Sequence, residues 1–168
     1  RYFTGFTGTT GIALAFAEKR FFFTDFRYVT QAKKEVEPNG FTVVKVERGA
    51  VDALAEYIKN SGIKKLGIED KYVTLAEYVV YKEKFEEIGF VTLGEALDKL
   101  RMIKTEEEIG YIKKAVEIGD KVFEYILDKV KEGAVEKDLA AEMEFQMKKL
   151  GGEGPSFETI IASNYRSA

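Results

Sequence analysis

The chain has 168 residues, of which 45% are apolar and 13% aromatic, and this composition supports a packed core and excludes a disordered protein. Its 26 basic and 29 acidic residues give a formal net charge of −3, which argues against a nucleic-acid partner, because such a partner favours a basic stripe. Cysteine and histidine are both absent, so a disulfide framework, a thiol nucleophile and a Ser-His-Asp triad are excluded within this sequence.

No stretch of the sequence approaches the ~20 apolar residues needed to cross a bilayer. No signal peptide is visible, so a cytoplasmic protein without a membrane partner is expected. The sequence begins at Arg1 rather than at a methionine, which indicates a start inside a longer protein. Lysine and glutamate dominate the charged residues, a balance that is typical of proteins from a thermophile.

The first forty residues are typical of strands followed by a helix. Runs of aromatic and apolar residues predict strands at 2–6, 12–17 and 20–24, with a hairpin joining the last two. Asp25 stands where the N-cap of a helix belongs, and this helix is expected to run to a Pro-Asn-Gly turn signal at 38–40. Arg27 is expected to make a local hydrogen bond or ion pair.

Residues 41–100 alternate between strand patterns and helix patterns. Strands are predicted at 41–47, 64–70 and 89–93, and helices at 51–62 and 74–87. Thr74 is the expected N-cap of the second helix. Strands that alternate with helices of this length predict crossover units and a largely parallel sheet. The predicted fold class is therefore α/β for an N-terminal domain over residues 1–100.

Residues 101–168 are typical of two amphipathic helices and a strand, which makes the second part α+β. Thr105 and Glu108 have the spacing of a capping box that begins the first helix, and Gly133 is expected to close that helix. A second helix is predicted at 136–150 from its apolar face.

A turn and a strand are predicted after the second helix. Pro155 fixes the backbone of the turn, and Phe157 stands at the mouth of a strand over residues 158–163. Alternate residues of this strand share one face, namely Thr159, Ile161 and Ser163. By spacing alone this is an ordinary junction between a loop and a strand.

Two ordered blocks of motifs resemble the Xaa-Pro aminopeptidase and prolidase family, the pita-bread metallopeptidases. The first block reads YFTGFTGTTGIAL and then FFFTDFRYVTQAKKEV, and the second reads RMIKTEEEI, GAVEKDLA and GPSFETIIAS. Together they cover residues 2–36 and 101–168, whereas residues 41–100 match only in their alternating pattern. The resemblance implies a truncated creatinase/prolidase-type N-terminal α/β domain over 1–100. It also implies that residues 101–168 are the opening helices and first strand of a pita-bread domain.

The sequence departs from the family pattern in four places. Val135 stands where threonine is usual, so the second helix lacks an N-cap worth about 1 kcal/mol. Asn164 stands where glycine is usual, which indicates a left-handed turn that asparagine can still adopt. The sequence ends at Ala168, just before the histidine that the family pattern leads us to expect, and the family's first strand and helix are missing ahead of Arg1. The resemblance therefore implies an internal fragment of a longer protein.

The resemblance implies a hydrolase that removes the N-terminal residue from a peptide substrate with proline in the second position. Family members hold two divalent metal ions, usually manganese, cobalt or zinc, around a bridging water. Phe157 is the expected apolar wall for the substrate's N-terminal side chain, with Ile161 beside it. No catalytic or metal-binding residue of the family has a counterpart here, so the 168 residues alone are expected to be inactive and to bind no metal. A homodimer is also expected, with exposed aromatic residues of 21–28 at the contact.

Two other functions share this fold. One is a metal-free pita-bread module used for binding, and the other is a creatinase-like amidinohydrolase. The residues that discriminate between these functions and the peptidase are expected beyond residue 168, so the sequence leaves the alternatives open.

Overall fold

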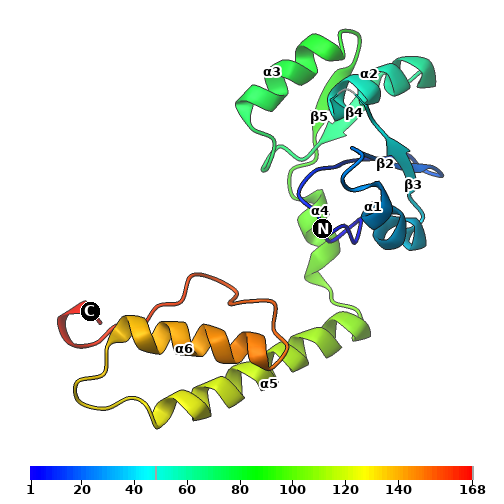
Figure 1. The fold of residues 1–168 in the computed structure, drawn as a ribbon. Coiled ribbons are helices and arrows are strands. Elements are labelled where there is room, and N and C mark those ends of the chain that lie inside the picture. Colours follow the sequence, from blue (N-terminus) through cyan, green and yellow to red (C-terminus); the bar gives the residue numbers. More distant parts are fainter. Residues whose placement is uncertain (48, 168) are drawn as a thin grey trace. The chain divides into compact units, whose positions relative to one another are not determined.

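The computed structural model describes residues 1–47 and 49–167 (Figure 1). The chain divides into two compact units, Arg1–Leu97 and Asp98–Ala168. The short helix α4 (Ala96–Met102) crosses the division. Within the described ranges, no helix combines the length and the apolar character that a membrane span requires.

The first sheet is formed by three strands around one crossover. Strands β1 (Ile12–Ala15) and β2 (Arg20–Thr24) are antiparallel, and β3 (Thr42–Lys45) pairs with β2 in parallel. The predicted hairpin is confirmed, since the amide of Phe16 donates to the carbonyl of Lys19 at 2.7 Å. Helix α1 (Val29–Val36) and the short 3-10 helix η1 (Glu37–Asn39) form the crossover from β2 to β3.

The second sheet is a parallel pair, β4 (Lys65–Ile68) and β5 (Gly89–Thr92). Helix α3 (Leu75–Lys84) connects these strands, and α2 (Ala50–Ser61) precedes them. The predicted crossover units and largely parallel pairing are confirmed, since two of the three strand pairs are parallel, but the strands do not share one sheet as expected. The described strands form two separate sheets, and β1 is antiparallel because a tight hairpin can join only antiparallel strands.

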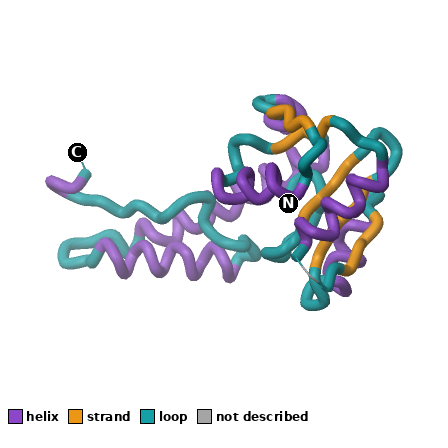
Figure 2. Tube along the Cα trace, turned by 90° about the horizontal axis from the view of Figure 1, so that it is seen from above, coloured by secondary structure: helices purple, strands orange, loops and turns teal. Residues whose placement is uncertain are grey.

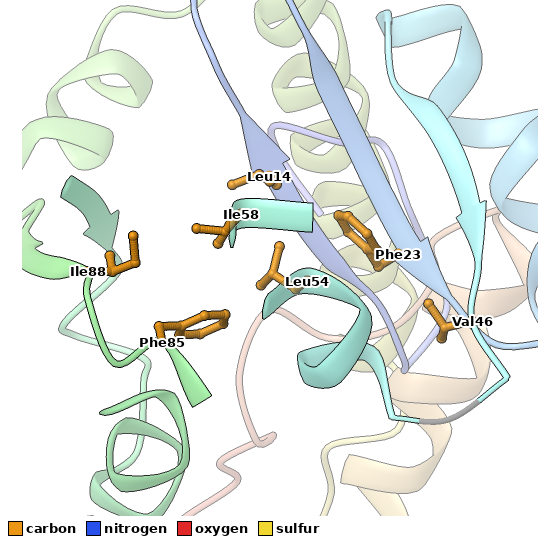
Figure 3. Packing of buried hydrophobic residues seen from close by; sticks show 7 residues of the cluster. All are labelled: Leu14, Phe23, Val46, Leu54, Ile58, Phe85 and Ile88. Atoms are coloured by element: carbon orange, nitrogen blue, oxygen red, sulfur yellow. The ribbon is translucent and has the colours of Figure 1, made fainter. Parts of the chain in front are cut away.

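Helix α2 joins the two sheets through one apolar core (Figure 3). Phe23 and Ile58 are each 1% exposed at the centre of this core. The buried members of the cluster come from β1, β2, the residues that flank the strands, and α2, namely Leu14, Phe23, Val46, Leu54, Ile58, Phe85 and Ile88. A second cluster packs around α1 and consists of Phe6, Phe22, Ala32, Val36 and Phe41. Strand β2 thus supplies both clusters from alternate faces.

Two predictions about the N-terminal region were wrong. Residues 2–6 do not form a strand: the amide of Gly5 donates to the carbonyl of Arg1 at 2.8 Å, and this closes a turn. Gly5 has φ 75°, a conformation that lies outside the strand region. Phe6 is nevertheless buried, so the segment contributes one core side chain without contributing a strand.

Asp25 is not the N-cap of the first helix. Helix α1 begins at Val29, with Tyr28 at the cap position and no side-chain capping bond. The carboxylate of Asp25 instead accepts from the backbone amide of Arg27 at 3.0 Å and from its guanidinium at 2.7 Å. The predicted local pairing of Arg27 is confirmed, and residues 26–28 form a turn that separates Asp25 from the start of the helix.

The second unit is a pair of helices, α5 (Glu106–Leu127) and α6 (Glu136–Lys149), that lie side by side (Figure 2). The predicted capping box at Thr105 and Glu108 is confirmed, since each side chain accepts from the other residue's backbone amide. Gly133 does not close α5, because the helix ends six residues earlier at Leu127. Gly133 adopts φ 82° within the connecting turn. The prediction of the longer helix was wrong at its C-terminal end.

The predicted strand over residues 158–163 was also wrong. This segment after α6 is neither helix nor strand. It ends in a 3-10 turn, η2 (Asn164–Arg166). A strand requires hydrogen bonds to a neighbouring strand, and no described strand pairs with this segment. The left-handed turn predicted at Asn164 is confirmed, with φ 54°.

We expect Phe23→Ala to lower the free energy of unfolding of the first unit by about 3–5 kcal/mol, because it leaves a cavity in a closed core. Phe26→Ala is the matched control, since Phe26 is 75% exposed. The control should change stability by no more than about 0.5 kcal/mol. Urea unfolding followed by near-ultraviolet circular dichroism measures both, and equal losses in the two variants would contradict the assignment of this core.

Val135→Thr should stabilise α6. Val135 occupies the N-cap with φ −96° and ψ 125° and provides no side-chain hydrogen bond to the helix. A threonine hydroxyl at this position can accept from an amide of the first turn, which is worth about 1 kcal/mol. Hydrogen exchange of the first-turn amides measures the gain. Val135→Ala is the control, and a threonine variant no more protected than this control would show that the cap is not formed.

Candidate functional site

The two residues predicted to bind substrate lie on the segment that follows α6. Phe157 is 73% exposed, whereas Ile161 is half-buried. Both follow Pro155, where the prediction placed the turn. Their role in substrate binding stays a prediction.

The beginning of this segment is held against the end of α6. The amide of Gly152 donates to the carbonyl of Met147 at 2.9 Å, and Gly151 adopts φ 98°. A Cβ at Gly152 would lie 3.0 Å from the same carbonyl oxygen, which is closer than backbone atoms normally allow. The two glycines thus let the chain reverse tightly from the helix into the segment.

The other end of the segment is held by Glu136, the first residue of α6. Its Oε1 accepts from the backbone amide of Ser163 at 2.8 Å and from the Ser163 hydroxyl at 2.7 Å. Its Oε2 accepts from Nη1 of Arg166 at 3.1 Å. One carboxylate therefore binds three donors that lie 27–30 residues further along the chain.

These contacts also set the charge state of Glu136. The hydroxyl and amide of Ser163, together with the nearby guanidinium of Arg166, lower the pKa of Glu136 below its ordinary value. The carboxylate is therefore ionised over the whole neutral range. The ionised form accepts from all three donors without giving up a lone pair to a proton.

Between its two ends the segment is only half-buried. Thr159 and Ile161 face inward from alternate positions, as the predicted spacing of two requires. Of the described side chains, that of Thr159 has a buried hydroxyl oxygen with no hydrogen-bond partner. Ser163, which was predicted on the same face, is exposed and pairs with Glu136 instead.

A second carboxylate with similar contacts lies in the first unit. Glu35 on α1 accepts from the backbone amide of Thr7 at 2.8 Å and from the Thr7 hydroxyl at 2.7 Å, and Gln31 donates to the same carboxylate. The amide and hydroxyl of Thr7, with the amide group of Gln31, lower the pKa of Glu35. This network fixes the glycine-rich N-terminal loop on α1.

Sequence reasoning did not find Glu136 or Glu35 as anchoring groups. Both are surface acids on helices, a pattern that usually means a solvated face. Glu136 lies inside the quoted motif GAVEKDLA, but no spacing rule links it to residues 163 and 166. Only the fold brings these residues together.

The described residues do not form a dinuclear metal site. Across residues 1–47 and 49–167, no group of three or more histidine, cysteine, aspartate or glutamate side chains is gathered where it could hold a metal ion. The carboxylate of Glu136 is already occupied by three donors, which leaves it poorly suited as a ligand.

Comparison with known proteins identifies the fold. The Xaa-Pro dipeptidase from Bacillus anthracis superimposes with a TM-score of 0.92 at 39% identity, covering 99% of this chain and 46% of that one. The X-Pro aminopeptidase from Thermotoga maritima gives a TM-score of 0.89 at 36% identity, with 99% and 47% covered. The fold is thus the N-terminal α/β domain of prolidases followed by the start of a pita-bread domain.

The family is shown by the sequence as well. Residues 1–103 match the Creatinase/Prolidase N-terminal domain, and residues 110–168 match Metallopeptidase family M24. The chain therefore belongs to the creatinase/prolidase family, which confirms the resemblance drawn from the motif blocks.

Two curated relatives have similar sequences over much of the chain. An uncharacterized peptidase of Bacillus subtilis is 38% identical over 168 residues, which are 100% of this chain and 47% of the relative. An Xaa-Pro dipeptidase of Pyrococcus furiosus is 39% identical over 145 residues, 84% of this chain and 40% of the relative. The chain thus spans less than half the length of these relatives.

Acid is expected to release Ser163 from Glu136. Because the folded-state pKa of Glu136 lies below its unfolded value of about 4.3, its stabilising contribution is complete above that value. The contribution is lost as the pH falls through the lower, folded pKa. The amide resonance of Ser163 should hold its chemical shift at neutral pH and move in acid, as the carboxylate of Glu136 takes up its proton.

The matched control for this titration is Glu136→Gln, which cannot ionise. In that variant the low-pH movement of the Ser163 resonance should be absent. A transition that persists unchanged would assign the titration to a different acid.

Proposed function

We propose that the whole protein containing this chain is a metal-dependent hydrolase of Xaa-Pro bonds at peptide N-termini. The observation that carries the proposal is the match to an Xaa-Pro dipeptidase over 99% of the chain at 39% identity, with M24 similarity over residues 110–168. The peptidase names of the relatives support the same reaction class. Membership of the M24 metallopeptidases implies divalent metal ions, and we propose two ions of manganese, cobalt or zinc.

We propose that residues 1–100 are the N-terminal domain of this enzyme and that 101–168 open its catalytic domain. Phe157 and Ile161 then line the site for the substrate's N-terminal side chain. The exposure of Phe157 supports this role, because an apolar ring at 73% exposure is available to a ligand. The metal ligands belong to other parts of the whole protein.

We also propose a homodimer. Of the aromatic residues in 21–28, only Phe26 is strongly exposed, since Phe22 and Phe23 are buried. Of the aromatic residues expected at the dimer contact, Phe26 is therefore the one available to a partner subunit. Sedimentation of the whole protein tests the dimer.

The proposed reaction is tested with the whole protein and an Xaa-Pro dipeptide, with manganese, cobalt or zinc added after removal of bound metal by a chelator. Hydrolysis should require one of these ions. The 168 residues alone should cleave nothing and should bind no stoichiometric metal in calorimetry. A metal-free binding module would cleave nothing at any length, and a creatinase-like enzyme would act on creatine but not on the dipeptide.

Phe157→Ala in the whole protein should lower kcat/KM for the dipeptide roughly tenfold, because an apolar contact with the substrate is lost. Phe145→Ala is the matched control, since Phe145 is an exposed phenylalanine on α6 and has no proposed role. Equal effects of the two substitutions would remove Phe157 from the substrate site.

A further inference from the structure

The segment proposed to bind substrate makes few attachments of its own. Among the described residues, no backbone hydrogen bond links 154–162 to the rest of the chain. Helix α6 holds the segment at one end, and Glu136 holds it at the other. A short segment with free backbone groups has little intrinsic preference for one position.

The C-terminal attachment is concentrated on a single carboxylate. Glu136 is 24% exposed and accepts from the Ser163 amide, the Ser163 hydroxyl and the Arg166 guanidinium. Asn164, with φ 54°, turns the chain so that Ser163 and Arg166 approach the same carboxylate. The turn is closed by the amide of Arg166, which donates to the carbonyl of Ser163 at 3.1 Å.

We infer that Glu136 is a positioning residue for substrate binding. It fixes Ser163, only two residues from Ile161, and through the short segment it limits the positions open to Phe157. The role deepens the proposed peptidase function and rests on it. Glu136 itself contacts no substrate in this assignment; it acts through the segment that carries the two apolar residues.

The anchoring is tested in the 168-residue chain by comparing Glu136→Ala and Glu136→Gln with the original. Amide hydrogen exchange at Ser163 should accelerate about tenfold in Glu136→Ala, since the acceptor is lost. The glutamine variant keeps one carbonyl oxygen for Ser163 but loses the charge facing Arg166, so its exchange should lie between the two. The methyl resonances of Ile161 should shift in the same order.

Glu144→Gln is the matched control, because it removes a charge from the same helix and Glu144 takes part in none of these contacts. Its exchange and methyl shifts should equal those of the original chain. Equal protection of Ser163 in the original and in Glu136→Ala overturns the anchoring, whatever the activity of the whole protein.

The positioning role is tested in the whole protein with an Xaa-Pro dipeptide. Glu136→Ala should raise KM severalfold with kcat little changed, because binding is disturbed and the chemical groups are not. Glu136→Gln should raise KM by less than Glu136→Ala does, and Glu144→Gln should leave KM unchanged. Faster exchange with an unchanged KM overturns the positioning role. If the unsubstituted whole protein cleaves no Xaa-Pro peptide, the proposed function fails together with the substrate role, and the exchange result then describes a fold contact alone.

Discussion

Strand β2 is the element on which the first unit depends, because its successive side chains enter two different cores. Phe23 packs with Ile58 of α2, whereas Phe22 packs with Val36 of α1. Both edges of β2 are paired, with β1 on one side and β3 on the other. A slip of one residue in either pairing would exchange the two phenylalanines between faces, so the register is fixed by both cores at once.

The second unit is organised differently, because its two helices bury little apolar surface. Within the described part of α5, only Val122 and Ile126 are buried, while Phe123 and Leu127 are more than half exposed. An isolated helix is marginal in water, so the capping box at Thr105 and the contact with α6 carry more of the stability of α5 than they would in a closed core.

The elements that could be predicted are those whose signals are local. The helix beginning after Thr74, the capping box at Thr105 and the left-handed Asn164 follow from short patterns, and all three are present. The strands at 2–6 and 158–163 failed because apolar alternation describes a side-chain pattern, whereas a strand also needs a partner for its backbone. Asp25 is not a cap because residues 26–28 form a turn and α1 begins only at Val29.

The candidate site was predictable only in part for the same reason. The motif blocks led to the family to which the chain belongs, since family membership is a property of residue order. The substrate role of Phe157 and Ile161 stays a prediction. The contacts that hold their segment join residue 136 to residues 163 and 166, and such pairs depend on how the helices fold back on each other. Polar contacts between residues this far apart in the sequence produce no regular spacing from which they could be predicted.

Glu35 and Glu136 each bind an irregular segment to a helix, one in each unit. Each is a helix carboxylate that accepts both the amide and the hydroxyl of one residue, Thr7 in the first unit and Ser163 in the second. Two donors from one residue on the same carboxylate fix the direction of an irregular segment, which a flexible surface ion pair does poorly. The N-terminal loop is held in addition by the buried ring of Phe6, so Glu35 shares its task with the core. The segment after α6 has no fully buried side chain among its described residues, and the position of its residues therefore depends far more on Glu136 than the position of the loop depends on Glu35.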